Sequence, residues 1–307
     1  MSNQTTLLLS PSPHMHSGKT TQLAMWGVCA SLLPVLGTAV YLFGTYVLIL
    51  TLVTCIGAVL AEAASLALRK RPWTGEVSSL VTGLILALTL PPHAPLWVGF
   101  VGGVIAIVLG KQVYGGTGAN PFNPAAVGRV FLLVSFPAQL TMWTAPFDGV
   151  STATPLGGAE ASLWTLTVGT HGGSMGETSA IAILCGAVIL FAMRLIDWQA
   201  PVGTVLGTAL IALLVGEDPV YHVLTGGLLF GAVYMATDWV TSPVTKRGRF
   251  IFGLGIGVLT MVIRVWGSYP EGVSFAILLM NALTPLINRA ELSLREKRRK
   301  AYVRATS

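Results

Sequence analysis

Long apolar runs separated by short polar segments are the feature that most constrains this chain. A helix needs roughly 20 apolar residues to cross a bilayer. Ten stretches qualify as candidate spans, two of them short: 22–42, 45–68, 77–91, 95–113, 124–137, 178–194, 200–216, 222–239, 250–267 and 272–288. Only 10% of the 307 residues are charged, and 53% are hydrophobic. The sequence therefore predicts an all-α integral membrane protein, and it excludes a soluble enzyme, a disordered chain and a nucleic-acid binder.

The positions of the basic residues predict how the spans are oriented. With ten spans and the amino terminus inside, 16 of the 18 lysines and arginines fall on one side of the membrane, which is then cytoplasmic. Arg129 and Arg264 lie within or at the edge of spans. The net charge of +6 arises largely from the tail at 289–307, which is typical of a membrane anchor. We therefore expect a cytoplasmic amino-terminal tail at 1–21 and a cytoplasmic carboxyl terminus.

A polar segment at 138–177 divides the spans into two groups of five, at 22–137 and 178–288. Because five is odd, the second group is inverted relative to the first. The pattern thus predicts about ten transmembrane helices in two inverted five-helix repeats, with short or broken helices. Such repeats usually build a site near the membrane midplane. The segment 138–177 is expected to be extracytoplasmic.

Cysteine and histidine give no metal site. The three cysteines are far apart and form no CxxC pair, so the chain by itself is expected to hold no iron–sulfur cluster, zinc ion or disulfide. The five histidines lack the spacing of ligands on a helix, and we expect them at the surface or at the membrane interface. They are His14, His16, His93, His171 and His222.

Polar residues within the apolar regions are the candidates for ion handling. Two Asn-Pro pairs interrupt residues 115–124, so Asn120 and Asn123 either line a cavity or lie in a plain cytoplasmic loop. Glu62 and Asp238 are carboxylates near the cytoplasmic ends of spans. Intramembrane carboxylates are expensive and usually functional. The alternatives are interfacial placement for Glu62 and a capped helix end for Asp238.

Six strings of the sequence belong together. They are SPSPHMHS (10–17), EVSSLVTGLILALTLPP (76–92), GGTGANPFNPAAVGRVF (115–131), HGGSMGETSAIA (171–182), MATDWVTSPVTKRGR (235–249) and YPEGVSFAILLMNALTPLIN (269–288). Any one of them is a weak signal, but all of them in order are a strong one. They resemble one family, the RnfD subunits of the ion-translocating ferredoxin:NAD oxidoreductase (Rnf) complex and the related NqrB subunits, and the resemblance extends over almost the whole chain.

The resemblance implies a covalent flavin in the extracytoplasmic segment. From the residues alone, 148–156 is a turn-rich loop and nothing marks Thr154. The family, however, carries FMN esterified to a threonine in a motif like D-x-x-[ST]-[GS]-A-T, installed by a flavin transferase. The string DGVSTAT fits through Asp148, Ser151, Ala153 and Thr154. Thr152 stands where the family most often has glycine, and Trp239 follows Asp238 where the family often has proline.

The same resemblance implies a function. We expect an electron-transfer subunit of an inner-membrane complex that couples electron flow between ferredoxin and NAD to movement of Na+ or H+. Other Rnf subunits, with iron–sulfur centres and flavins, would be its partners, and a noncovalent riboflavin is a further expected cofactor. The alternatives are an NqrB-like subunit of a sodium-translocating NADH:quinone reductase, a urea-transporter-like channel and a purely structural scaffold. The flavin motif discriminates, because a channel or a scaffold has no use for it.

Overall fold

The chain folds into a body of α-helices. A computed structural model describes residues 20–306 apart from 74, 76 and 268–270, and it describes no side chains beyond Glu296. The expected amino-terminal tail therefore lies almost wholly outside the described residues, as do His14 and His16. Within the described part, the extended backbone amounts to one isolated bridge between Thr144 and Ser151.

The first half of the chain forms six α-helices and one short 3-10 helix. They are α1 (Thr21–Phe43), α2 (Tyr46–Leu68), α3 (Ser78–Leu88), α4 (Leu96–Val108), η1 (Gln112–Tyr114), α5 (Pro124–Ser135) and α6 (Pro137–Leu140). The second half begins with η2 (Pro155–Gly157), α7 (Leu163–Val168), α8 (Ala180–Ala192) and α9 (Gln199–Val215). It ends with α10 (Pro219–Leu224), α11 (Leu228–Phe230), the π-helix η3 (Gly231–Met235), α12 (Lys246–Trp266) and α13 (Val273–Thr306).

The prediction of an all-helical, multi-pass membrane protein is confirmed. Five helical segments among the described residues are long and apolar enough to cross a membrane: Thr21–Phe43, Tyr46–Leu68, Leu96–Tyr114, Lys246–Trp266 and Val273–Glu296. Four shorter apolar helices coincide with other expected spans: α3, α5, α8 and α9. The count of ten crossings stays a prediction.

The expected span at 222–239 is not one continuous helix. Its helical pieces are α10, α11 and η3, and the chain breaks between α10 and α11. Gly226 and Gly227 both adopt left-handed backbone conformations there, with φ of 62° and 68°. Glycine adopts this left-handed conformation readily, and a right-handed helix cannot continue through it. The broken segment thus places free backbone groups and a Gly-Gly turn inside the protein.

Each half is built around one pair of helices in very close contact. In the first half, α2 packs on α4, and a Cβ added to Gly57 would lie 2.5 Å from the carbonyl oxygen of Phe100. In the second half, α9 packs on α12. There, a Cβ on Gly257 would collide with the backbone of Thr204. Small residues permit such backbone approach between helices in membranes. In each half, the second and fourth expected spans pair in this way. The two inverted repeats stay a prediction.

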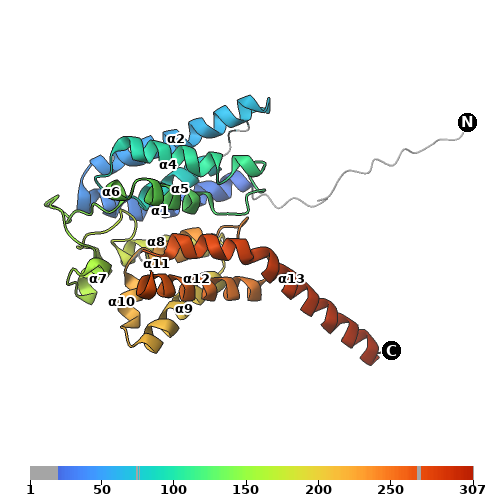
Figure 1. Cartoon of the computed structure of the whole chain (residues 1–307). Helices are drawn as coiled ribbons and strands as arrows, with labels where there is room; N and C mark the ends of the chain where they lie inside the picture. The colour runs from blue at the N-terminus through green and yellow to red at the C-terminus, as the bar shows by residue number, and fades with distance from the viewer. Residues whose placement is uncertain (1–19, 74, 76, 268–270, 307) are drawn as a thin grey trace, which may run out of the picture.

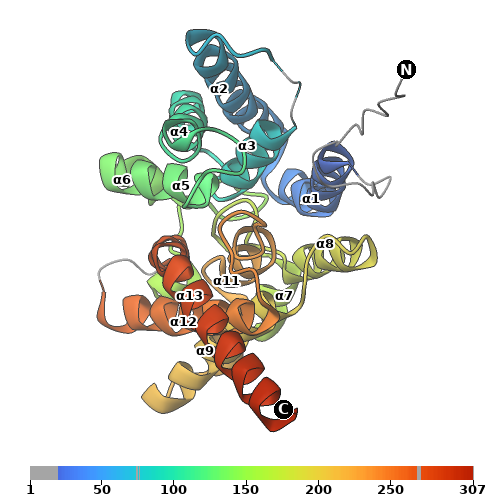
Figure 2. The same ribbon diagram turned by 90° about the vertical axis from the view of Figure 1, so that its right-hand side faces the viewer.

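The two halves meet face to face along their length. Figure 2 shows α1–α6 in one half and α7–α13 in the other, with α1 beside α8 and α5 near α13. The hydroxyl of Tyr234 on η3 donates to the carbonyl of Ser31 on α1 at 2.7 Å, which joins the halves through a buried bond.

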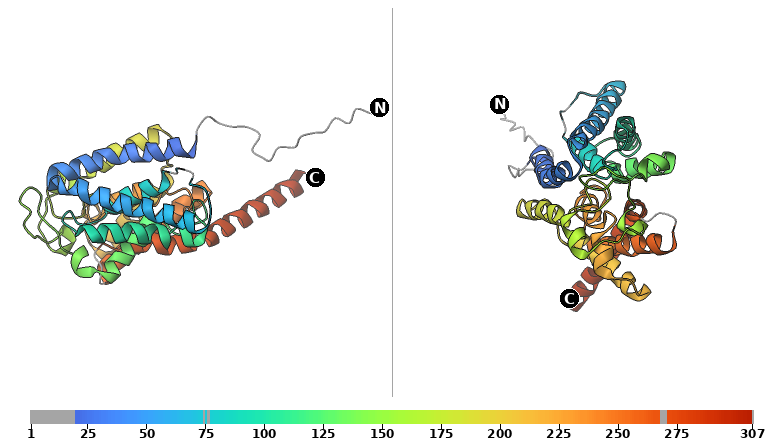
Figure 3. Two further views of the ribbon diagram at one scale, coloured as in Figure 1. Left: turned by 90° about the horizontal axis from the view of Figure 1, so that it is seen from above. Right: turned by 90° about the vertical axis from the view of Figure 1, so that its left-hand side faces the viewer.

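The helical body has two ends, and both halves contribute to each of them. In Figure 1, α6, α7 and α10 lie at one end of the body, and α13 leaves the body at the other. Figure 3 shows that α1 begins on the side to which α13 extends. The basic groups at Arg69–Arg71, Lys111 and Lys246–Arg249 belong to that side. We call it the basic end, and the side of α6, α7 and α10 the opposite end.

The glycine contacts predict a stability difference between two alanine substitutions. Gly257→Ala should lower the free energy of unfolding by about 1–3 kcal/mol, because the new methyl group overpacks the α9–α12 contact. Gly37→Ala in α1 has nothing within 4 Å of the added Cβ and should be neutral or slightly stabilising. Thermal unfolding of both variants in the same detergent measures this. Equal effects would contradict the packing role of Gly257.

Candidate functional site

A cavity lies between the two halves, toward the basic end. It contains about 810 Å³ of space free of protein atoms, part of it open to the outside. Its lining is mixed. The apolar lining comes from α1, α3, α8 and η3 and includes Met25, Val28, Val81, Ile85, Leu190 and Val233. The polar lining, which we call the polar wall, comprises Ser78, Thr82, Lys111, Thr117, Asn120, Asn123 and Asp238. We call this space the inter-half cavity. A lining that combines apolar side chains with several polar groups suits an amphipathic ligand.

Asn123 holds the polar wall together. Its Oδ1 accepts from the backbone N–H of Ala126 at 3.1 Å and so caps α5. Its Nδ2 donates to the carbonyl of Met235 at 3.2 Å, and its backbone N–H donates to Oδ1 of Asn281 at 3.0 Å. Residues 115–124 are therefore a built part of the interface between the halves, as the cavity interpretation predicted. Asn281 was missed by the sequence analysis, although it stood within the string at 269–288.

Two more predicted residues face the same space. Asn120 lines the cavity, and its Nδ2 donates to the carbonyl of Phe122 at 3.1 Å. Asp238 also lines it, directly after η3. The Asp238 carboxylate accepts from the hydroxyl of Thr241 at 3.0 Å and from the backbone N–H of Val240 at 3.3 Å. Asp238 therefore does take part in capping a turn, and it reaches the cavity as well.

Glu62 is buried in an ion pair. Its Oε1 lies 2.5 Å from Nζ of Lys111, and both side chains are nearly inaccessible, at 4% and 3%. Nε2 of Gln112 donates to the same oxygen at 3.2 Å. Lys111 was missed as a functional residue. The signal for it was a lone lysine at the end of the apolar run 95–113 and directly before the Gly/Asn/Pro string.

The expected flavin motif lies at the opposite end, in a loop formed by residues 143–157, which we call the attachment loop. The backbone N–H groups of Ala145 and Thr152 donate to Val150 and Trp143, at 2.8 and 3.0 Å, and close a small hairpin. The three recognition residues of the motif, Asp148, Ser151 and Ala153, are exposed. Thr154 is buried, with 8% of its surface accessible.

Thr154 is held in one orientation by the first turn of η2. Its Oγ1 accepts from the backbone N–H of Gly157 at 3.1 Å, and its carbonyl accepts from Gly157 and Ala159. The hydroxyl of Tyr221 on α10 donates to the carbonyl of Pro155 at 2.7 Å. The attachment loop is thereby fixed to the broken segment of the second half.

The Arg264 side chain holds that broken segment in place through hydrogen bonds. It donates to the carbonyls of His222, Thr225 and Gly226, at 2.6, 2.8 and 3.2 Å. These carbonyls lie where the helix stops and have no helical partner. Gly226 in turn packs against Leu156, two residues after Thr154. A single arginine thus orders the seat of the attachment loop.

A buried group of charges lies at the same end. Arg129 on α5 pairs with Glu271 before α13, with Nη2 to Oε2 at 2.5 Å. Glu177, which precedes α8, accepts from the backbone N–H of Ser174 at 2.8 Å. Burial, followed by repulsion from Glu271, raises the pKa of Glu177 to about 7, against the opposing effect of the Ser174 bond and Arg129.

The histidines were expected at the surface or at the membrane interface, and two of them are not at the surface of the protein. His171 and His222 are each only 8% exposed, whereas His93 is exposed and bonds through Nδ1 to Thr144 at 3.0 Å. Gly172, next to His171, packs against Thr152 of the attachment loop, and the carbonyl of His222 accepts from Arg264 in the broken segment. No group of three or more metal-binding side chains occurs in the described part of the chain.

Together, the fold and the site define a polytopic α-helical membrane protein with a cavity between its halves and an ordered attachment loop at its opposite end. A sequence profile of the NQR2, RnfD, RnfE family matches residues 8–294. The chain belongs to this family.

Three relatives show how close the similarity is. The chain is 44% identical to the RnfD subunit of the Na+-translocating ferredoxin:NAD+ oxidoreductase complex of Acetobacterium woodii, over 94% of each chain. It is 42% identical to the RnfD subunit of the ion-translocating oxidoreductase complex of Stutzerimonas stutzeri, over 86% of this chain and 89% of the relative. It is 39% identical to the RnfD subunit of the proton-translocating ferredoxin:NAD+ oxidoreductase complex of Clostridium ljungdahlii, over 92% and 93%.

The pKa of Glu177 predicts a pH-dependent stability. A carboxyl group with a raised pKa in the folded state favours folding while it is protonated. Its contribution is therefore complete below about 4.5, the ordinary value, and is lost as pH rises through about 7. The loss should reach about 3 kcal/mol in the free energy of unfolding. Glu177→Gln should abolish this decline between pH 5 and 8 in thermal unfolding, and exposed Glu160→Gln should leave it intact.

Proposed function

We propose that this chain is the membrane electron-transfer subunit of an ion-translocating ferredoxin:NAD+ oxidoreductase complex, with FMN bound covalently to Thr154. The names of its relatives support the complex, since all three are the corresponding subunit of an ion-translocating oxidoreductase. They favour this complex over the quinone-reductase alternative within the same family. The chain would lie in the inner membrane with both termini cytoplasmic and the attachment loop outside. The other Rnf subunits, with iron–sulfur centres and flavins, would surround it in the bilayer.

The observation that carries the covalent flavin is the geometry of the attachment loop. A transferase needs access to its recognition residues, and Asp148, Ser151 and Ala153 are exposed. Esterification replaces the hydroxyl proton of Thr154 by a bond from Oγ1 to phosphorus. The oxygen keeps a lone pair, so it can still accept from the N–H of Gly157. The residues present therefore fit the group, provided that the loop opens while the transferase acts.

We place the second expected cofactor, a noncovalent riboflavin, in the inter-half cavity, whose mixed lining supports this assignment. Apolar side chains on α1, α3, α8 and η3 would cover the ring faces, and Asn120, Thr117 and Ser78 would bind its polar edge. Bound flavins supply one- and two-electron chemistry, and the protein supplies position and electrostatics. The chain would then hold one flavin toward each end of the membrane, a suitable arrangement for carrying electrons across it.

Ion handling is assigned to the polar wall of the cavity. Asp238 and Glu62 supply carboxylates at the basic end, and Asn120 and Asn123 supply amide oxygens beside them. Oxygen ligands of this kind suit Na+ and also accept protons. The interrupted backbone at 115–124 and the turn after η3 are the parts that would change shape with redox state.

The covalent flavin is tested by one substitution and a matched control. Wild-type chain co-expressed with a flavin transferase should fluoresce on a denaturing gel, on a peptide heavier by FMN less one water. Thr154→Val should lose this fluorescence completely, because the nucleophilic oxygen is gone. Thr141→Val, an exposed threonine nearby, should retain it. A dark wild type with an active transferase would overturn the proposal.

The ion pathway is tested separately. Asp238→Asn should lower redox-driven Na+ or H+ uptake by vesicles severalfold, because it removes a carboxylate from the cavity wall. Flavin fluorescence on Thr154 should not change, since the two sites lie at opposite ends. Glu296→Gln, an exposed carboxylate on α13 that does not line the cavity, is the control. Unchanged ion uptake in Asp238→Asn would remove this residue from the pathway.

A further inference from the structure

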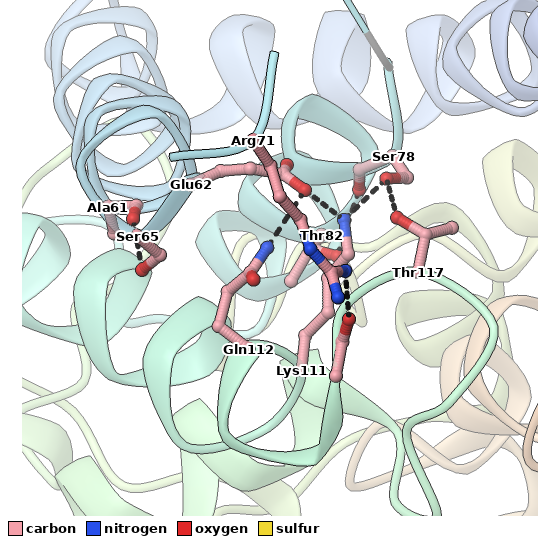
Figure 4. Close-up of polar contacts among 10 residues, drawn as sticks. Ala61, Glu62, Ser65, Arg71, Ser78, Thr82, Lys111, Gln112 and Thr117 are labelled. Atoms are coloured by element: carbon pink, nitrogen blue, oxygen red, sulfur yellow. Dashed lines mark hydrogen bonds and ion pairs between the residues drawn. The ribbon is translucent and has the colours of Figure 1, made fainter. Parts of the chain in front are cut away.

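Lys111 places a buried positive charge in the wall of the inter-half cavity. Its Nζ donates to Oε1 of Glu62 at 2.5 Å and to Oγ of Ser78 at 2.6 Å (Figure 4). Lys111 and Ser78 line the cavity, whereas Glu62 does not. The ammonium group therefore lies between a carboxylate behind the wall and the space in front of it.

The acceptor side of this cluster is incompletely bonded. Oε1 of Glu62 accepts from both Lys111 and Gln112, whereas Oε2 is buried without a hydrogen-bond partner. Oε1 of Gln112 is likewise buried and unpartnered. Buried polar atoms are normally satisfied, so two such oxygens at one ion pair require an explanation. They supply the kind of oxygen ligand that a proton or a monovalent cation needs.

Other charges hold the surrounding backbone rather than the carboxylate. Arg69 donates through Nη2 to the carbonyl of Gln112, and Arg71 donates through Nη1 to the carbonyl of Gly115 at 3.5 Å. Both arginines belong to the basic end, where the end of α2 meets the segment after α4. They keep that segment in place while leaving the Lys111 side chain on its own flexible stem.

We propose that Lys111 is a movable counter-charge for the cavity. It neutralises Glu62 while the cavity occupant is uncharged, and it turns toward the occupant when the occupant gains negative charge. Glu62 then takes up a proton or a sodium ion from the basic end. This inference deepens the proposed function and rests on its second, noncovalent flavin.

The physical reason is the low polarity of the site. Charges separated by a few ångströms interact strongly away from water, so extra negative charge in the cavity competes directly with Glu62 for the ammonium. The lysine side chain has a flexible four-carbon stem, so its ammonium group can move. Lys111 also donates a hydrogen bond to Ser78, and this bond does not depend on Glu62. A carboxylate that loses its ammonium partner in such a site must acquire another cation.

The charges balance in this step. Two electrons would come from an iron–sulfur donor in a partner subunit, and the cavity flavin would take them up with one proton, so that it gains one negative charge. Lys111 would neutralise that charge, and one cation would enter at Glu62 for the charge that Lys111 no longer neutralises there. No covalent bond of the protein forms or breaks. When the electrons leave, Lys111 returns to Glu62 and the cation is released.

The first test measures affinity rather than activity. Full-length chain in lipid nanodiscs is titrated with riboflavin, oxidised or reduced with dithionite. Lys111→Met should weaken binding of the reduced form relative to the oxidised form by about tenfold, equivalent to about 30 mV for a two-electron couple. Lys111→Arg keeps the charge and should restore the ratio. Lys246→Met, an exposed lysine at the basic end, should not change it.

The second test identifies the cation. The riboflavin midpoint potential of the wild type is measured against Na+ concentration at fixed pH, and against pH without Na+. One of the two titrations should show the uptake of one cation per reduction at Glu62, and Glu62→Gln should remove that dependence. Loss of the Na+ dependence identifies the cation as sodium, and loss of the corresponding part of the pH dependence identifies it as a proton. The exposed control Glu160→Gln should keep both dependences.

The outcomes separate this inference from the proposed function. An unchanged affinity ratio in Lys111→Met, or unchanged cation dependences in Glu62→Gln, would overturn the counter-charge. A wild type that binds riboflavin in neither redox state would overturn it too, while the covalent flavin is judged independently by Thr154 fluorescence. The same fluorescence on each variant shows that the chain has folded and inserted.

Discussion

Interrupted backbone inside a membrane protein must be satisfied by other groups of the protein, and this structure depends on how that is done. No water in the bilayer core replaces a missing hydrogen bond. Here, the string at 115–124 and the turn after η3 are joined across the halves by Asn123, whose side chain bonds to the carbonyl of Met235. Asn281 extends this link by donating to the carbonyl of Thr241 at 3.3 Å. Without these amides, neither break could lie in the interior.

The same constraint explains why the cavity forms where it does. Two interrupted segments, one from each half, meet at the cavity, since residues 115–124 and the turn after η3 both contribute to its lining. Asn120 and Asn123 bond to interrupted backbone and also line the cavity. A ligand or an ion can therefore use groups that the backbone itself requires.

Much of this was predictable from the sequence because it depends on local chemistry. Apolar runs fix where helices form, and Pro and Gly fix where they stop, so the segment around Asn120 and Asn123 was expected either to line a cavity or to form a plain cytoplasmic loop. Long-range pairings were not predictable in this way. Nothing in the sequence near Glu62 indicates that Lys111, 49 residues away, is its partner. The burial of His171 and His222 was missed for the same reason, since it depends on tertiary packing that spacing along the chain does not show. The family resemblance marks Thr154, but it does not tell that this side chain faces inward while its recognition residues face outward.

The separation of the two proposed flavin sites gives the two ends of the molecule different tasks. At the opposite end, Tyr221 holds the attachment loop through the carbonyl of Pro155, and Arg264 holds the neighbouring broken segment through its carbonyls. At the basic end, Lys111 donates both to Glu62 behind the cavity wall and to Ser78, which lines the cavity. Buried atoms without a hydrogen-bond partner occur at both ends, among them Oε2 of Glu62 and Oε1 of Glu271, so they do not distinguish the two ends. What differs is that the buried ammonium group of Lys111 borders a cavity. Under our proposal, the coupling of charge movement to cation uptake therefore belongs at the cavity rather than at Thr154.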